Sequence, residues 1–288
     1  RPLLLDKFKF LLNFPELICF GTRSAYFRTK MRKRIKTDSP ITLYVNRHRI
    51  LFTSFDQFKN IDDNDILNKF NIVFENEKGY DSQGLTREWF TLLSREIFNQ
   101  NYALFVCSPN NQSYSPNSFS YINENHLDYF RFAGRFVARA LIQGQCIDAH
   151  LTTSFLKQIL HRRPKFEDLQ VIDETLYTSL EYLKNNDVDS LEMVFAVNYD
   201  SFGKVKTYNL IENGENIHLT NDNKEIYIKL RMNYSFEVTI KEQLMAFSEG
   251  FDSLISHDEI RLFTPDELDL LICGIPIIDV NDFKENIS

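Results

Sequence analysis

The sequence has 288 residues, of which 43% are hydrophobic and 25% are charged, an ordinary balance for a globular protein. Its 40 acidic residues against 33 Lys and Arg give a formal net charge of −7, which disfavours a protein dedicated to binding nucleic acid. The apolar runs are far shorter than the roughly 20 residues needed to cross a bilayer, and charges at Asp6, Lys7 and Lys9 make the N-terminus a poor signal peptide. We therefore expect a cytoplasmic or nuclear protein without membrane or nucleic-acid partners.

Hydrophobic periodicity predicts the elements of the first half. Alternation over residues 41–47 and an apolar run at 71–75 indicate two strands. Apolar residues at helical spacing predict helices over 85–98, 125–144 and 152–163. The second of these helices is apolar on several faces and should be buried. Its Gly134 costs helix propensity, which suggests that another helix approaches closely there.

The composition changes after Pro164. Residues 173–186 read as a short amphipathic helix that Asp173 can cap, followed by strand-like runs around a turn at 200–203. Helical spacing returns over 223–247. Near the end, Thr264 and Glu267 form a capping box around Pro265 at the first helical position, and Gly274 ends that helix.

These elements predict a mostly α protein with small β units, an α+β fold. Its helical body comprises residues 1–167 and 246–280, and a small α+β unit is inserted at 168–245.

The four cysteines give no sign of a metal or nucleophile site. Cys19, Cys107, Cys146 and Cys273 include no pair with CxxC spacing, so a structural zinc site is not expected. Cys146 and His150 would share a face only if their segment were helical, and such a pair is more often packing. Cys273 lies among apolar residues, which make a thiol inert. We expect no cofactor and no metal.

The stretch "GYDSQGLTREWF", residues 79–90, raises two ligand-binding alternatives. It lacks the Gly-Lys-Ser/Thr of a phosphate loop, and Asp81 with its two polar neighbours offers few oxygens for a calcium loop. The simpler interpretation is a turn in which Gly79 or Gly84 takes a positive φ, leading into a core helix anchored by Trp89, the only tryptophan.

The same stretch, continued as "GYDSQGLTREWFTLLSREIFN", resembles the signature of the HECT family of ubiquitin ligases, with Gln83 where the family usually has glycine. Six further segments resemble the family in the same order: "NYALF", "HLDYFRFAGRFVARAL", "SFLKQILHR", "LTNDNKEIYIKL", "QLMAFSEGF" and "FTPDELDLLICGIPIIDVNDFK". They span nearly the whole chain, and their sequences most resemble those of the very large ligases of fungi and animals.

The resemblance implies a bilobal enzyme. A HECT N-lobe, a helical large subdomain with an inserted small α+β subdomain, recruits a ubiquitin-loaded conjugating enzyme. A C-lobe cysteine accepts ubiquitin as a thioester and passes it to a substrate lysine. No H-T-C-F-N-like stretch occurs in this sequence, so we expect an N-lobe without a catalytic residue of its own, and the start of a hinge at 281–288. Expected partners are the conjugating enzyme, ubiquitin, and protein substrates bound by regions outside this chain.

The resemblance also places the conjugating-enzyme groove in the small unit, where a phenylalanine of the partner enters. The matching positions are Leu176, Ser179, Leu180 and Leu183 on the short helix, Leu191 and Met193, which alternate along the next strand, and Tyr227 and Arg231 on the later helix. Leu180, in the middle of the helical stripe, is expected to be partly exposed. Arg231 stands where the family often has an apolar or aromatic residue. The alternative is that these leucines are simply core, as in most small units.

Two other functions compete with this one. A non-catalytic helical interaction domain remains an alternative. A hydrolase or nucleotide-binding enzyme is disfavoured, because the sequence shows neither a phosphate motif nor a nucleophile–base pair.

Overall fold

The computed structural model describes residues 9–62, 64–77, 84–110 and 112–274. The helices are α2 (Phe20–Arg32), α3 (Ile50–Phe58), α4 (Gly84–Ile97), α5 (His126–Gln143), α6 (Thr153–Ile159), α7 (Leu169–Ile172), α8 (Glu174–Asn185), α9 (Lys224–Asn233), α10 (Lys241–Asp252), α11 (His257–Ile260) and α12 (Pro265–Cys273). The strands are β1 (Lys36–Val45), β2 (Asn68–Phe74), β3 (Phe105–Cys107), β4 (Tyr114–Pro116), β5 (Ala196–Ser201) and β6 (Lys204–Asn209). Short 3-10 helices are Lys9–Asn13, Pro15–Leu17, Arg47–Arg49, Gln100–Tyr102, Ser120–Ile122, Phe166–Asp168 and Gly214–Asn216.

The mostly helical α+β class is confirmed, and the predicted elements over 41–47, 71–75, 85–98 and 173–186 appear as β1, β2, α4 and α8. The capping box at the start of α12 is also present: Thr264 Oγ1 accepts from the Glu267 N–H and the Glu267 carboxylate accepts from the Thr264 N–H. The helix predicted over 223–247 is wrong as a single element. A π-helix at Tyr234–Val238 separates α9 from α10, and such an insertion leaves the apolar spacing on either side almost unchanged.

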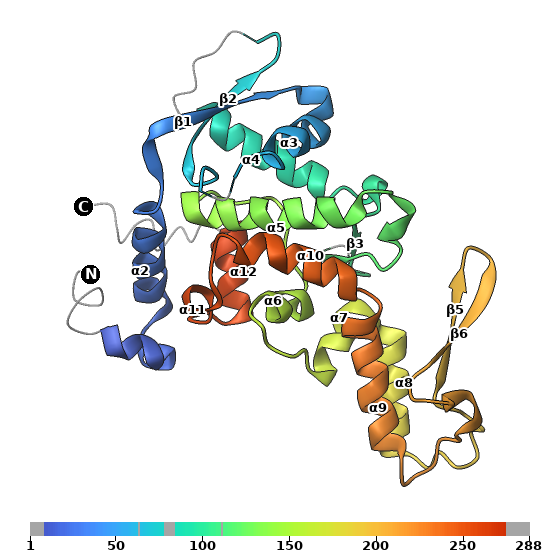
Figure 1. Cartoon of the computed structure of the whole chain (residues 1–288). Coiled ribbons are helices and arrows are strands. Elements are labelled where there is room, and N and C mark those ends of the chain that lie inside the picture. The colour runs from blue at the N-terminus through green and yellow to red at the C-terminus, as the bar shows by residue number, and fades with distance from the viewer. Residues whose placement is uncertain (1–8, 63, 78–83, 111, 275–288) are drawn as a thin grey trace.

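Helix α5 runs across the middle of the molecule (Figure 1), with β1, β2, α3 and α4 on one side of it. β1 and β2 pair in parallel, and α3 lies in the connection between them. β2 buries alternate residues, Asn68, Phe70, Ile72 and Phe74, as a strand with one covered face must. The aromatic side chains of this layer surround Trp89 of α4, which is completely buried.

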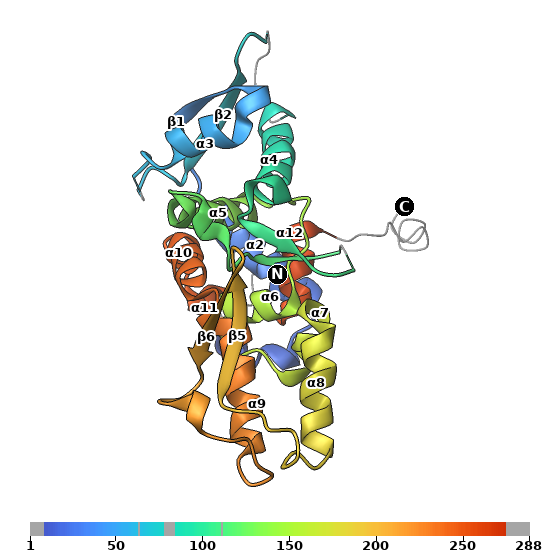
Figure 2. The same cartoon turned by 90° about the vertical axis from the view of Figure 1, so that its right-hand side faces the viewer.

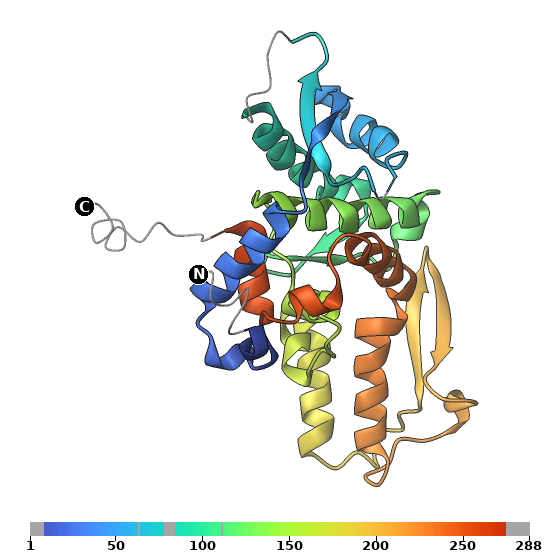
Figure 3. The same ribbon diagram turned by 60° about the vertical axis from the view of Figure 1, so that its left-hand side comes forward.

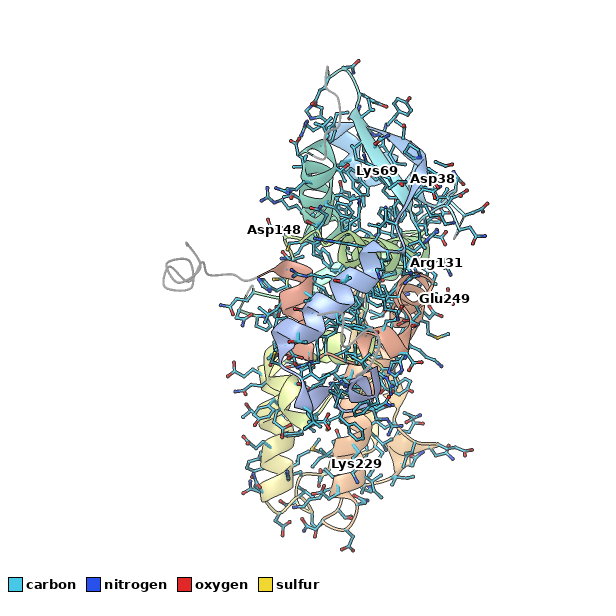
Figure 4. All side chains as sticks on the ribbon, turned by 90° about the vertical axis from the view of Figure 1, so that its left-hand side faces the viewer. Asp38, Lys69, Arg131, Asp148, Lys229 and Glu249 are labelled. Carbon is cyan, nitrogen blue, oxygen red and sulfur yellow. The ribbon has the colours of Figure 1, made fainter. Side chains whose placement is uncertain are left out.

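On its other side α5 packs against α10, and two glycines permit the approach. A Cβ on Gly134 would lie 2.0 Å from the Phe247 carbonyl oxygen, and one on Gly250 would lie 2.0 Å from that of Arg131. Figure 4 shows Arg131 beside Glu249, whose carboxylate accepts from the Arg131 Nη2 at 2.7 Å. The close approach predicted from Gly134 is therefore confirmed, and Gly250 is its counterpart on the second helix.

Two separate hydrophobic cores hold the molecule together. The first core draws on residues between Phe27 and Leu160 and again between Ala246 and Ile272. The second core consists of Leu169, Leu176, Leu180, Leu183, Val188, Phe195, Leu219, Tyr227, Ile228 and Phe236. Where the chain passes from the first core to the second, the buried Asp168 accepts two hydrogen bonds from Lys157 Nζ, at 2.8 and 2.6 Å.

The second core lies between two helices and a hairpin. α8 and α9 lie side by side (Figure 3), with the β5–β6 hairpin beside α9. Phe202 and Gly203, both with positive φ, form the two-residue turn of the hairpin, at the turn predicted for 200–203. The hairpin extends from the second core toward the rest of the molecule (Figure 2), and the Phe202 ring contacts those of Phe119 and Tyr121 at its tip.

The prediction that Gly79 or Gly84 takes a positive φ is not met by Gly84 and stays a prediction for Gly79. Gly84 is the first residue of α4 and does not have a positive φ, because it already takes the helical conformation. Gly79 lies outside the described residues, as does Asp81. Within the part of the chain that the structure describes, no helix combines the length and the apolar character needed to cross a bilayer.

Candidate partner-binding pocket

A capping residue and the spacing of three leucines explain why helix α8 forms and which of its faces is buried. Asp173 caps it, since its Oδ1 accepts from the Leu176 N–H at 2.9 Å, as the sequence predicted. Leu176, Leu180 and Leu183 then follow at steps of four and three and lie on one face of the helix. This face turns toward α9 and contributes to the second core.

Between α8 and α9 lies a pocket of about 310 Å³, which we call the α8–α9 pocket. Its lining residues are Asp173, Thr175, Leu176, Ser179, Leu180, Leu183, Met193, Tyr227 and Arg231. Every residue expected from the sequence to form a groove lines this pocket, except Leu191. The arrangement is an apolar floor with polar groups around it, which suits one inserted apolar or aromatic side chain.

The expectation that Leu180 is partly exposed is wrong. Leu180 is only 2% exposed, and Leu176 and Leu183 are also buried. Two helices side by side cover the leucine face, so these side chains form the floor of the pocket and belong to the second core at the same time. Ser179, which is exposed, and Met193, which is half-buried, are accessible from outside.

Tyr227 and Arg231 form the α9 side of the pocket. The Tyr227 ring packs edge-on against Phe195, with 5.4 Å between ring centroids. Burial raises the pKa of the Tyr227 phenol, and the neighbouring Arg231 guanidinium partly offsets this. Arg231 also lies against the ring of Tyr234, its carbon Cζ 5.6 Å from the ring centroid. The pocket therefore has an aromatic wall with a fixed cation at its edge.

Leu191 and Met193 do not form the alternating strand pair that the sequence suggested. Glu192 between them has a φ of 50°, so the chain turns there, and β5 begins only at Ala196. Leu191 is 37% exposed and lies outside the pocket lining. A non-glycine residue with positive φ gives no clear signal in sequence, which is why the alternation was misleading.

Two lining residues, Asp173 and Thr175, were not predicted. Thr175 precedes Ser179 by four positions and therefore lies on the same side of α8, next to it. The Ser179 hydroxyl donates to the Thr175 carbonyl oxygen at 2.7 Å. Helical spacing alone was the signal that could have identified Thr175.

A larger hollow of about 760 Å³ lies elsewhere, beside the C-terminal end of α5. Its lining includes Arg32, Lys69 and Arg87, with threonines and glutamines but none of the residues expected for a partner groove. Among the described residues that line it there is neither a carboxylate–histidine pair nor another acid–base arrangement.

The four thiols are free and differ in environment. Burial raises the pKa of the Cys273 thiol, in keeping with its expected inertness. Cys19 is exposed, and hydrogen bonds with the hydroxyl and backbone of Thr22 hold its pKa below the ordinary value. The sequence did not predict this lowered pKa, because it depends on the turn that begins α2.

Comparison with known proteins gives consistent matches. Residues 91–288 match the family described as HECT-domain (ubiquitin-transferase). The chain is 36% identical to E3 ubiquitin-protein ligase UPL2 of Arabidopsis thaliana over 99% of its length, and to E3 ubiquitin-protein ligase TOM1 of Saccharomyces cerevisiae and HUWE1 of Mus musculus over 97%. These matches cover 8%, 9% and 6% of the respective relatives, so the chain spans less than a tenth of their length.

Proposed function

Because this chain belongs to the HECT-domain family of ubiquitin ligases, we propose that it is the N-lobe of such a ligase and recruits a ubiquitin-loaded conjugating enzyme. In this proposal residues 168–245, which contain the whole second core, form the small subdomain. Residues 1–167 and 246–280 form the large subdomain. Ubiquitin would pass to a cysteine of a C-lobe beyond the hinge at 281–288, and from there to a substrate lysine.

The α8–α9 pocket carries the proposal. Seven residues expected from the resemblance converge from α8, α9 and the segment before β5 to line a single cavity of about 310 Å³. A partner's aromatic side chain would be desolvated by the leucines and Tyr227. Anchors of this kind, buried in a central pocket, supply a large share of interface affinity.

Ser179→Arg is expected to weaken binding of a ubiquitin-conjugating enzyme by at least about tenfold, which corresponds to about 1.4 kcal/mol. The exposed Ser179 lies at the pocket, so a long charged side chain there would occupy the entrance and place a second cation beside Arg231. Folding should change little, because arginine is a good helix former at an exposed position. The measurement is a calorimetric titration with a panel of conjugating enzymes.

Thr178→Arg is the matched control. Thr178 is exposed on the same helix and makes the same kind of bond, its hydroxyl donating to the Glu174 carbonyl oxygen at 2.9 Å, but it does not line the pocket. Equal affinities for both variants and the unchanged chain would remove the pocket from the proposal. Failure of the unchanged chain to bind the panel would favour the alternative, a helical interaction domain outside ubiquitin transfer.

The chain is also expected to form no ubiquitin thioester of its own. None of its four cysteines lies in the sequence context of the family's nucleophile. Incubation with activating enzyme, conjugating enzyme and ubiquitin, followed by a non-reducing gel, tests this. A reductant-sensitive adduct that disappears with a cysteine substitution would contradict the expectation, and Cys19→Ser is the first variant to examine because of its lowered thiol pKa.

A further inference from the structure

Far from the α8–α9 pocket, three potential metal ligands of different chemistry converge. His150 Nδ1 lies 2.7 Å from Asp269 Oδ2, and Cys273 Sγ lies 3.7 Å from Asp269 Oδ1. The three donor atoms all lie within 4.8 Å of one another. No other group of this kind occurs among the described residues. We call these residues the His150–Asp269–Cys273 cluster.

The fold holds the cluster together through the backbone. Asp269 and Cys273 are four residues apart on α12, so they lie on one face of the helix, a spacing that often supplies two metal ligands. The segment carrying His150 is attached to the end of this helix, because the Ile147 N–H donates to the Ile272 carbonyl oxygen at 2.9 Å. The Cys273 thiol donates to the Ala149 carbonyl oxygen at 3.1 Å, on the same segment.

Cys146 lies at the edge of the cluster. Its Sγ is 3.0 Å from the point that a Cβ on Gly274 would occupy, directly after Cys273. The sequence therefore offers a pair of ligands in each segment, Cys146 with His150 and Asp269 with Cys273, each pair separated by three residues.

We propose that His150, Asp269 and Cys273 bind one divalent transition-metal ion of the zinc class, with Cys146 or a water molecule completing a tetrahedron. A nitrogen, a carboxylate oxygen and a sulfur suit zinc or cobalt and exclude magnesium and calcium, which prefer oxygen ligands alone. On binding, the Cys273 thiol releases its proton and the thiolate bonds to the metal, while His150 binds as a neutral imidazole and moves its remaining ring proton to Nε2. In this proposal His150 is a ligand, whereas the sequence alone favoured packing for Cys146 and His150.

The metal has access from solvent. The side chains of His150 and Asp269 are 44% and 23% exposed, and both line a hollow of about 600 Å³. An ion there would join the last turn of α12 to the segment after α5. An ion that binds only the folded state stabilises it by an amount that rises with the logarithm of its concentration over its Kd, which gives a readout independent of any ubiquitin chemistry.

The test is titration of the 288-residue chain with cobalt(II) chloride under a non-thiol reductant. We expect one cobalt per chain, with the near-ultraviolet charge-transfer absorption of a cobalt–thiolate bond, displacement by zinc, and a higher melting temperature with zinc. Cys273→Ala should abolish the thiolate absorption if water is the fourth ligand and reduce it if Cys146 is, and His150→Gln should weaken cobalt binding by at least about tenfold, since the loss even of a hydrogen-bond partner behind a ligand costs about 10–100-fold. Cys146→Ala should lower the sulfur-to-metal absorption if Cys146 is the fourth ligand and should leave it unchanged if the fourth ligand is water.

Two controls match these variants. Cys107→Ala removes a thiol outside the cluster. His161→Gln removes a histidine that also pairs with a carboxylate, since its Nε2 lies 3.3 Å from an Asp252 oxygen, but that belongs to no group of three potential ligands among the described residues. Both should leave cobalt binding unchanged. Absence of cobalt–thiolate absorption in the unchanged chain, or equal absorption after Cys273→Ala, would overturn the proposal and leave the cluster as a hydrogen-bonded packing contact.

Discussion

Trp89→Ala is expected to lower the free energy of unfolding by about 3–5 kcal/mol, as truncation of a large core aromatic does. Trp89 has no exposed surface, and its ring contacts Phe70, Phe90 and Phe136 at centroid distances of 6.2, 4.8 and 5.7 Å. Its Nε1 donates to Ser54 Oγ at 2.9 Å, so the substitution also removes the hydrogen-bond donor of a buried hydroxyl. The measurement is denaturant unfolding followed by circular dichroism.

Phe52→Ala is a suitable control for this substitution. Phe52 lies on α3, near Ser54, but is 38% exposed, so its truncation leaves no closed cavity and should cost about 1 kcal/mol or less. If Trp89→Ala costs no more than Phe52→Ala, the tryptophan does not hold α4 against the first core. Ordered phosphate or metal at residues 79–90 would then deserve a direct search, since ligand binding was the alternative for that stretch.

The contrast between what the sequence predicted well and poorly has a physical basis. Trp89, the Asp173 cap and the capping box at Thr264 depend on local spacing and local hydrogen bonds, and the structure contains all three. The parallel pairing of β1 with β2 depends on contacts between distant segments, and the π-helix before α10 depends on how the helix meets both cores. Neither leaves a distinct pattern in a single sequence.

The α8–α9 pocket shows the same contrast between local features and contacts of distant segments. Helical spacing placed Leu176, Leu180 and Leu183 on one face, but it could not say how far α9 would cover that face. Seven of the eight residues that the resemblance implied line one pocket, whereas the exposure of Leu180, expected from its role in a groove, and the strand alternation of Leu191 and Met193 around Glu192 were wrong. Burial is a property of both surfaces in a contact, and the pattern of one helix describes only one of them.

Leu180→Asp is therefore expected to unfold the second core rather than only to weaken partner binding. Leu180 is 2% exposed within that core, so an aspartate there would lose the leucine packing and would have to be desolvated or disrupt the helix pair. The cost should be roughly 3 kcal/mol or more in unfolding free energy. Hydrogen exchange resolved by segment should show loss of protection over α8 and α9, while α5 and α10 in the first core keep theirs.

Leu180→Met separates this effect from binding. Methionine nearly conserves the volume and should cost less than about 1.5 kcal/mol, so the second core should remain folded. With Ser179→Arg folded and defective in binding, and Leu180→Asp unfolded in α8 and α9, the leucine face has a structural role and the exposed side of the pocket carries recognition. If Leu180→Asp instead melts like the unchanged chain and loses only its partner, Leu180 must be accessible in solution. The helix pair would then have to open to admit the partner, because the closed pair buries this side chain.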